Sequence, residues 1–138
     1  MFFRSFLAAS VMALVGSGCS AAQSFCQKQE ECAEEILGEE GADARDDAND
    51  DDPDDNVAVC TAFAQGNLDA LRANEEEDCR VLADAQEAFQ ACMGGLSCND
   101  LEDEFSSILE DGEGDKCEDQ FDDLNDAQEG AANDNCFG

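Results

Sequence analysis

Residues 74–109 of this chain read NEEEDCRVLADAQEAFQACMGGLSCNDLEDEFSSIL. In the first half of this stretch the larger side chains recur every three or four positions, which is the period of a helix with one buried face. The pair Gly94-Gly95 ends that helix, and Ser97 followed by Asp100 is a pattern that begins another. The stretch therefore predicts two consecutive amphipathic helices joined by a short turn.

Similar signals lie on both sides of this stretch. Asn56 begins a helix that runs to about residue 72. One side of this helix carries the residues that are expected to face the core, which are Cys60, Phe63, Ala64, Leu68 and Leu71. Asp115 followed by Glu118 begins the last helix of the chain. β-Branched residues are few and no alternating apolar–polar run occurs, which leaves little room for strands. Residues 57–138 are therefore predicted to form an all-α module.

The N-terminus has the order of a secretory signal peptide. Arg4 gives a positive start, an uncharged apolar run follows to Gly16, and small residues come next. The run is shorter than the roughly 20 apolar residues that span a bilayer. Residues 1–18 are therefore predicted to be a cleaved signal, and residues 19–24 a tether.

The Gly18-Cys19 junction resembles the lipobox of bacterial lipoproteins, in which the cysteine becomes the lipidated first residue. Gly16 departs from that pattern, because an aliphatic residue usually stands there, and cleavage after Ala22 also satisfies the small-residue rule. Lipidation of Cys19 is the prediction, with the protein at the bacterial outer membrane or periplasmic face. Free secretion is the alternative.

The chain has nine cysteines, and eight remain when Cys19 is set aside. An even number after an export signal implies a disulfide framework. A zinc site is disfavoured, because there is no Cys-x-x-Cys pair and no histidine. The predicted disulfide cysteines are Cys26, Cys32, Cys60, Cys79, Cys92, Cys98, Cys117 and Cys136.

Helix geometry restricts the pairing of these cysteines. Cys79 and Cys92 lie on one predicted helix, about 20 Å apart along its axis, so they cannot bond each other. Cys26 and Cys32 likewise need different partners if their helix is regular. If successive helices run antiparallel, Cys79 and Cys117 lie at one end of the module, and this pair is favoured. The same assumption leaves Cys26 and Cys32 only each other, so the two arguments conflict.

The chain is strongly acidic and poor in large apolar residues. Its formal net charge is −30, and from residue 19 on only 19 of 120 residues are Leu, Ile, Val or Phe. Such a composition predicts disorder unless disulfides restrict the unfolded chain. The staples are therefore expected to be required for folding.

Ten of the acidic residues fall within residues 39–56. Like charges repel and nothing there can be buried, so this segment is predicted to be an acidic disordered linker. It would separate an N-terminal cysteine-containing helix at 25–38 from the disulfide-stapled helical module at 57–138. The predicted fold is an all-α, small disulfide-stapled helical bundle with an N-terminal helix and an acidic disordered linker.

The composition disfavours several classes of function. The absence of histidine removes Ser-His and Cys-His nucleophiles, and no phosphate-binding glycine loop occurs. We therefore expect no catalytic residue, no cofactor and no enzymatic activity. Repulsion by phosphates argues against nucleic acid and against direct contact with anionic lipid headgroups, so membrane contact would come through the lipid anchor only.

Calcium is the one metal that the acidic runs suggest, because it prefers hard oxygen ligands. A dedicated EF-hand loop needs glycine at its sixth position, and both candidate runs lack it. No dedicated metal site is therefore predicted. The weak candidates for diffuse divalent-cation binding are Asp47, Asn49 and Asp51 in the first run and Asp111, Glu113 and Asp115 in the second.

The second half of the chain resembles small cysteine-rich lipoproteins of myxobacteria and related delta-type proteobacteria. The likeness lies in an alanine-rich helix, a Cys-x5-Cys turn from Cys92 to Cys98 and two further cysteines at long spacing, Cys117 and Cys136. It covers roughly residues 60–138. Because the members of this group are mostly uncharacterised, the resemblance implies location and architecture and no activity. The turn is also loosely similar to that of elicitins, which are helical secreted lipid carriers.

Three functional hypotheses follow. The first is a non-enzymatic secreted or envelope lipoprotein that acts as a structural or partner-binding module with an unknown protein partner. The second is a carrier of a small apolar ligand, which needs a cavity although few apolar residues are available to line one. The third is an acidic protein that binds calcium weakly. The sequence leaves the oligomeric state open.

Overall fold

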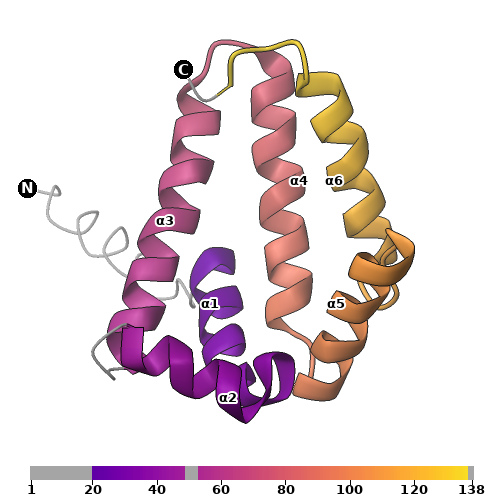
Figure 1. Cartoon of the computed structure of the whole chain (residues 1–138). Coiled ribbons are helices and arrows are strands. Elements are labelled where there is room, and N and C mark those ends of the chain that lie inside the picture. Colours follow the sequence, from indigo (N-terminus) through magenta and orange to yellow (C-terminus); the bar gives the residue numbers. More distant parts are fainter. Residues whose placement is uncertain (1–19, 49–52, 137–138) are drawn as a thin grey trace, which may run out of the picture.

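The computed structural model describes residues 20–48 and 53–136, and within these ranges it consists of helices without strands (Figure 1). The predicted all-α class is confirmed, and so is the stapling of the bundle by disulfides. No helix in the described ranges is both long enough and apolar enough to cross a membrane. The elements are α1 (Ala21–Glu31), α2 (Ala33–Ala48), α3 (Pro53–Ala73), α4 (Glu77–Gly94), α5 (Cys98–Asp111) and α6 (Glu118–Ala131).

The first helix begins four residues before its predicted start at residue 25. The Ser20 hydroxyl accepts a hydrogen bond from the Gln23 backbone N–H at 3.1 Å, so Ser20 caps α1. Ala22 is fully buried within this first turn. The predicted tether at 19–24 is therefore wrong over residues 21–24, because cap and burial together extend the helix.

The predicted disordered linker at 39–56 is also wrong wherever the structure describes it. Residues 39–48 belong to α2 and residues 53–56 to α3, while residues 49–52 lie outside the described ranges. Gly38 bends the chain with φ of +74° and the helix then resumes. Pro53 suits the first position of a helix, and the acids that follow it favour the positive end of the helix dipole. Local helix signals outweigh the repulsion between like charges.

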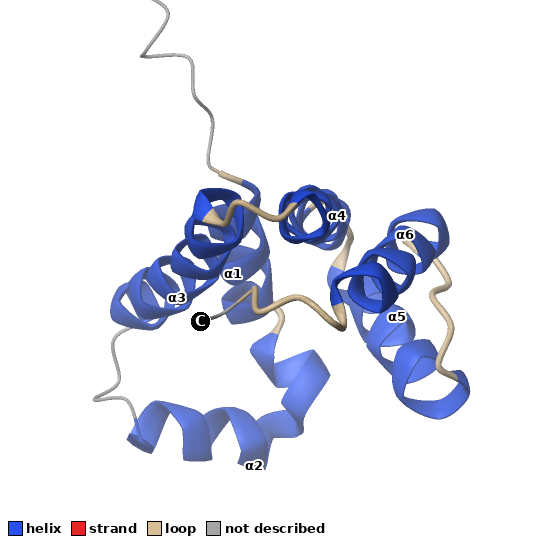
Figure 2. Cartoon of the chain, turned by 90° about the horizontal axis from the view of Figure 1, so that it is seen from above, coloured by secondary structure: helices blue, strands red, loops and turns tan. Residues whose placement is uncertain are grey.

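The helices form one unit rather than a module with a separate N-terminal helix. α3 and α4 run antiparallel, and α1 packs against both of them (Figure 1). Seen from above, α4 stands between α1 and α3 on one side and α5 and α6 on the other (Figure 2). α2 lies across the lower end of the bundle and packs against α5. The predicted division into an N-terminal helix and a module at 57–138 is therefore wrong.

Two separate clusters of buried residues make up the core. The first joins α3, α4 and α6 around Leu68, Leu71 and Leu82. The second joins the lower part of α4 to α1, α2 and α5 around Met93 and Leu101. Three of the four disulfides have both of their cysteines in these clusters, whereas Cys26–Cys60 lies outside them.

The disulfides differ from the favoured pairing. The bonds are Cys26–Cys60, Cys32–Cys98, Cys79–Cys136 and Cys92–Cys117, with Cα–Cα distances of 5.2–6.0 Å. The predicted Cys79–Cys117 pair is wrong. The prediction that Cys79 does not bond Cys92 is confirmed. Of the two conflicting arguments about Cys26 and Cys32, the one from helix spacing holds, because these cysteines have different partners.

The Cys79–Cys117 pair was mispredicted because the path of α5 was mispredicted. α5 turns aside and packs against α2, so α6 rather than α5 lies antiparallel against α4. The 14 residues of α6 span about 21 Å, close to the roughly 20 Å between Cys79 and Cys92. Cys117, before α6, therefore lies beside Cys92, and Cys136, after α6, lies beside Cys79.

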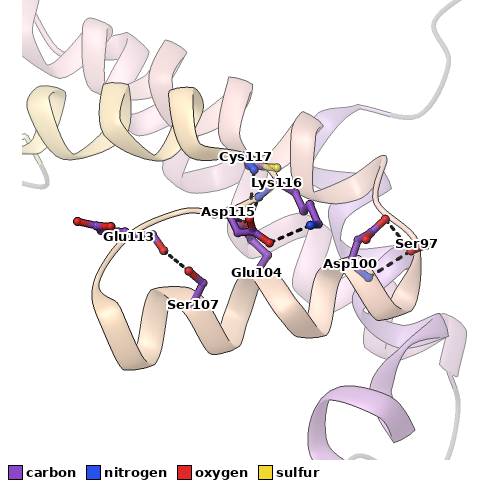
Figure 3. A network of polar contacts seen from close by, with 8 residues as sticks. All are labelled: Ser97, Asp100, Glu104, Ser107, Glu113, Asp115, Lys116 and Cys117. Carbon is purple, nitrogen blue, oxygen red and sulfur yellow. Dashed lines mark hydrogen bonds and ion pairs between the residues drawn. The ribbon is translucent and has the colours of Figure 1, made fainter.

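The turn between α5 and α6 is organised around the fully buried carboxylate of Glu104 (Figure 3). Its Oε2 accepts hydrogen bonds from the backbone N–H groups of Asp115 at 2.8 Å, Lys116, and Cys117 at 3.4 Å. The Ser107 hydroxyl donates to the Glu113 carbonyl at 2.9 Å. These bonds fix where the chain leaves α5, and thereby where α6 begins.

Candidate functional site

The acidic residues considered for calcium do not come together in the described part of the chain. Asp115 pairs with Lys116 at 2.9 Å, and the Glu113 side chain points away from Asp115 (Figure 3). Among the described residues no group of three or more His, Cys, Asp or Glu side chains is arranged to hold a metal ion. The side chain of Asp47, together with Asn49 and Asp51, lies outside the described part.

The cysteines offer no thiol chemistry within the described ranges. All eight cysteines that the structure describes are in disulfides. Cys19, the predicted lipidation site, and the predicted signal at 1–18 lie outside those ranges. The described cysteines therefore have a structural role.

An open apolar groove of about 550 Å³ lies between α1, α2 and α3, where α5 also contributes Phe105. The Cys26–Cys60 disulfide joins α1 to α3 along this groove and holds its two walls together. The apolar side chains of its walls are Ile36, Leu37, Val59, Phe63 and Phe105. The groove is therefore a surface with a rigid base and an apolar lining.

Large apolar side chains are exposed mainly at this groove. Within the described ranges five such side chains are exposed, and three of them, Leu37, Val59 and Phe63, line it. Val59 and Phe63 are each 72% exposed and Leu37 is 49% exposed. Contiguous exposed apolar residues mark interaction sites, whereas scattered ones do not.

The sequence explains how α3 presents this patch. Ala64, Leu68 and Leu71 are buried in the core, as their helical spacing predicts. Phe63 was predicted on the same apolar face of α3, but it lies at the edge of that face and points into the groove. Val59, one turn before Phe63, extends the groove wall along the same helix.

The charge around the groove is negative. Asp55 lies in the groove wall, and Glu34, Glu35, Glu39 and Glu40 are exposed on α2. Asn56, also in the wall, has a buried Nδ2 without a hydrogen-bond partner in the described part of the chain. The groove thus combines an apolar lining with one carboxylate in its wall and with exposed carboxylates on α2, one of the helices that form it.

The described basic side chains are already engaged within the protein. Lys28 pairs with Glu31 at 3.0 Å. Arg72 pairs with Glu87, and with Asp84 at 3.4 Å. The hydrogen bond to Glu87 raises the pKa of Arg72, and that to Asp115 raises the pKa of Lys116. Arg80 donates to the Asn74 carbonyl at 3.4 Å. The excess negative charge therefore has to be balanced from outside the chain.

Sequence reasoning missed most of this groove. The prediction placed Phe63 on a core-facing side and did not use Ile36, Leu37 or Val59. The available signals were the adjacent apolar pair before Gly38 and the spacing of four between Val59 and Phe63. The contribution of Phe105 depends on the path of α5 and had no local signal.

Comparison with protein-family models, curated proteins and solved structures found no match to this chain. The fold and the groove therefore define the class of this protein by its architecture alone. It is a disulfide-stapled all-α bundle with an acidic surface and an open apolar groove. The resemblance to myxobacterial cysteine-rich lipoproteins stays a prediction.

Proposed function

We propose that this protein is a non-enzymatic, exported binding module of the bacterial envelope, and that its groove takes a cationic amphipathic helix of a partner protein. The observation that carries the proposal is the gathering of Leu37, Val59 and Phe63 at one acidic groove. A helix with anchors at positions i, i+3, i+4 and i+7 would cover these side chains. Lysine or arginine on its flanks would meet the uncompensated carboxylates.

A helical partner fits the groove better than a small molecule does. The three exposed side chains come from two helices, and a small ligand would leave most of their surface in water. The Cys26–Cys60 disulfide holds α1 and α3 together, so little freedom would be lost when a partner binds. The proposed interaction is therefore between a preformed groove and one face of a helix.

Export and lipidation form part of the same proposal. Four disulfides suit an oxidising compartment outside the cytoplasm. The signal-like N-terminus and Cys19 support attachment through a lipid at the outer membrane or periplasmic face. The acidic surface would repel anionic headgroups and leave the groove available to a protein.

Fluorescence anisotropy with labelled synthetic peptides tests the groove. One peptide places leucine on one helical face and lysine on the other, a second replaces lysine with glutamate, and a third scrambles the leucine–lysine order. We expect saturable binding of the first peptide alone. Equal binding of the scrambled peptide would show that charge alone is responsible and would contradict the proposal.

A matched pair of variants locates the binding. Phe63→Ser removes an exposed ring from the groove, whereas Leu109→Ser removes an exposed side chain from α5 outside it. We expect Phe63→Ser to weaken binding of the leucine–lysine peptide by at least about tenfold, as loss of an interface anchor does. Leu109→Ser should bind as the wild type does. Equal peptide affinities for the wild type and both variants would rule out the groove as the binding site.

A further inference from the structure

A second pocket, open to solvent on one side and called the cavity below, lies between α4, α6, the side of α1 and the C-terminal turn, and its volume is about 530 Å³. It lies where the core is interrupted. On its wall, Leu82 and Leu124 belong to the first cluster of the core, and Phe25 and Phe89 belong to the second. Its size is within the range of small-molecule sites in proteins.

Glutamine stands on α4 where an apolar residue would have closed this gap. Leu82, Gln86 and Gln90 follow one another at a spacing of four, so they lie along one line of the helix surface, and all three line the cavity. Gln90 is only 5% exposed. Its Oε1 is buried and has no hydrogen-bond partner in the described ranges.

A buried amide atom without a partner costs free energy and calls for an explanation. Leucine at position 90 would have joined the two clusters without that cost. A half-turn of the terminal amide exchanges its oxygen and nitrogen, so Gln90 can either accept from or donate to a group in the cavity. A bound molecule with a hydroxyl or amide group would supply the missing partner.

The lining of the cavity differs in charge from the rest of the molecule. The chain has 36 acidic residues, yet Asp134 is the one charged residue among those that line this cavity. An anionic ligand would be repelled by the surrounding protein, and a cationic one would find a single carboxylate. The lining therefore favours an uncharged molecule.

We propose that this cavity binds a small neutral molecule with an apolar body and one hydroxyl or amide group, which hydrogen-bonds to Gln90. The apolar body lies between Phe25, Phe89 and Leu124. The site is separate from the groove between α1, α2 and α3, and the inference does not rest on the proposed function of that groove.

Displacement of the uncharged fluorescent dye N-phenylnaphthylamine from the full disulfide-bonded protein tests this site. Decanol should displace the dye, and decanoate, with the same chain length and a negative charge, should bind at least about tenfold more weakly. No dye binding together with no decanol-induced rise in melting temperature would overturn the proposal. Equal displacement by decanoate would also overturn it.

The variant Gln90→Leu separates the hydrogen bond from the apolar contacts. We expect it to bind the dye and to lose about tenfold in affinity for decanol, equivalent to about 1.4 kcal/mol. Phe63→Ser, in the other groove, should leave decanol binding unchanged. Unchanged decanol affinity in Gln90→Leu would refute the role of Gln90.

A measurement on the wild type covers the case in which the variant does not fold. Titration with decanol should move the side-chain amide signal of Gln90 in nitrogen–proton NMR spectra, because the amide gains a partner. Shifts at Val59 and Phe63 without any shift at Gln90 would place the alcohol in the other groove and overturn the inference.

Discussion

Reduction of the four disulfides is expected to unfold the bundle. In the chain-entropy description, a disulfide stabilises a protein by restricting the unfolded chain, and its contribution grows slowly with the length of the closed loop. The sequence separations here run from 25 for Cys92–Cys117 to 66 for Cys32–Cys98. These correspond to about 3.5 and 4.4 kcal/mol respectively at 25 °C.

The four bonds together contribute at most about as much as the whole stability of an ordinary domain. Separations of 34 for Cys26–Cys60 and 57 for Cys79–Cys136 give about 3.8 and 4.2 kcal/mol. The simple sum is about 16 kcal/mol, and the overlap of the loops makes it an upper bound. A natural domain has a total stability of about 5–15 kcal/mol. The small apolar core cannot replace a contribution of this size.

The assay is far-ultraviolet circular dichroism during thermal unfolding, with and without excess reductant. We expect most of the helical signal to be lost on reduction at 25 °C and to return on oxidative refolding. As a graded test, the double variant Cys79→Ser with Cys136→Ser should lose about 4 kcal/mol in chemical denaturation. Unchanged helicity and an unchanged melting temperature in reductant would refute the reasoning.

Three further predictions follow from the packing. Glu104→Ala should lower the free energy of unfolding by about 2–3 kcal/mol in urea denaturation, because it removes the acceptor of three backbone N–H groups; a loss under about 0.5 kcal/mol would contradict this. A Cβ at Gly94 would lie 3.0 Å from the Phe25 backbone nitrogen, so Gly94→Ala should lower the melting temperature. A Cβ at Gly66 would meet open space, so Gly66→Ala should raise the melting temperature slightly, and a higher melting temperature for Gly94→Ala than for Gly66→Ala would contradict both expectations. Leu68→Ala should cost about 3 kcal/mol and Leu109→Ala under about 0.5 kcal/mol in the same denaturation experiment, and equal costs would refute the assignment of the core.

The parts of the fold that local signals determine were predictable from the sequence. Ser97 accepts a hydrogen bond from the Asp100 backbone N–H at 3.2 Å, as the capping pattern before α5 indicates. Leu68, Leu71 and Met93 are buried, as their helical spacing indicates. The even set of cysteines after the predicted signal also forms disulfides.

The parts that depend on tertiary packing were not predictable in this way. Glu104 lies on the apolar stripe of α5 between Leu101 and Phe105, and its burial is compensated only by the turn that it holds. That turn places α6 on α4 and thereby decides the partners of Cys79 and Cys92. Caps and periodicity locate helices along the chain, but they do not say which helix packs on which.

The misprediction of residues 39–48 and 53–56 has a different cause. Repulsion among exposed carboxylates is weak in water, because charges 4 Å apart interact by only about 1 kcal/mol at that dielectric constant. The tendency of alanine and glutamate to form helix, with proline at the first position of α3, is comparable in size and favours order. A high density of one charge therefore does not by itself determine that a segment is disordered.

The disulfides also account for the surface on which both proposals rest. A chain held together by packing alone would have to bury most of its few large apolar residues. Here the four bonds restrict the unfolded chain instead, so Leu37, Val59 and Phe63 remain exposed and a cavity persists between the two clusters. Exposed in the folded protein, these three side chains contribute little to its stability and are accessible to a partner. Phe63→Ser should accordingly weaken peptide binding while leaving the melting temperature nearly unchanged, and a large drop in melting temperature would show that Phe63 belongs to the core.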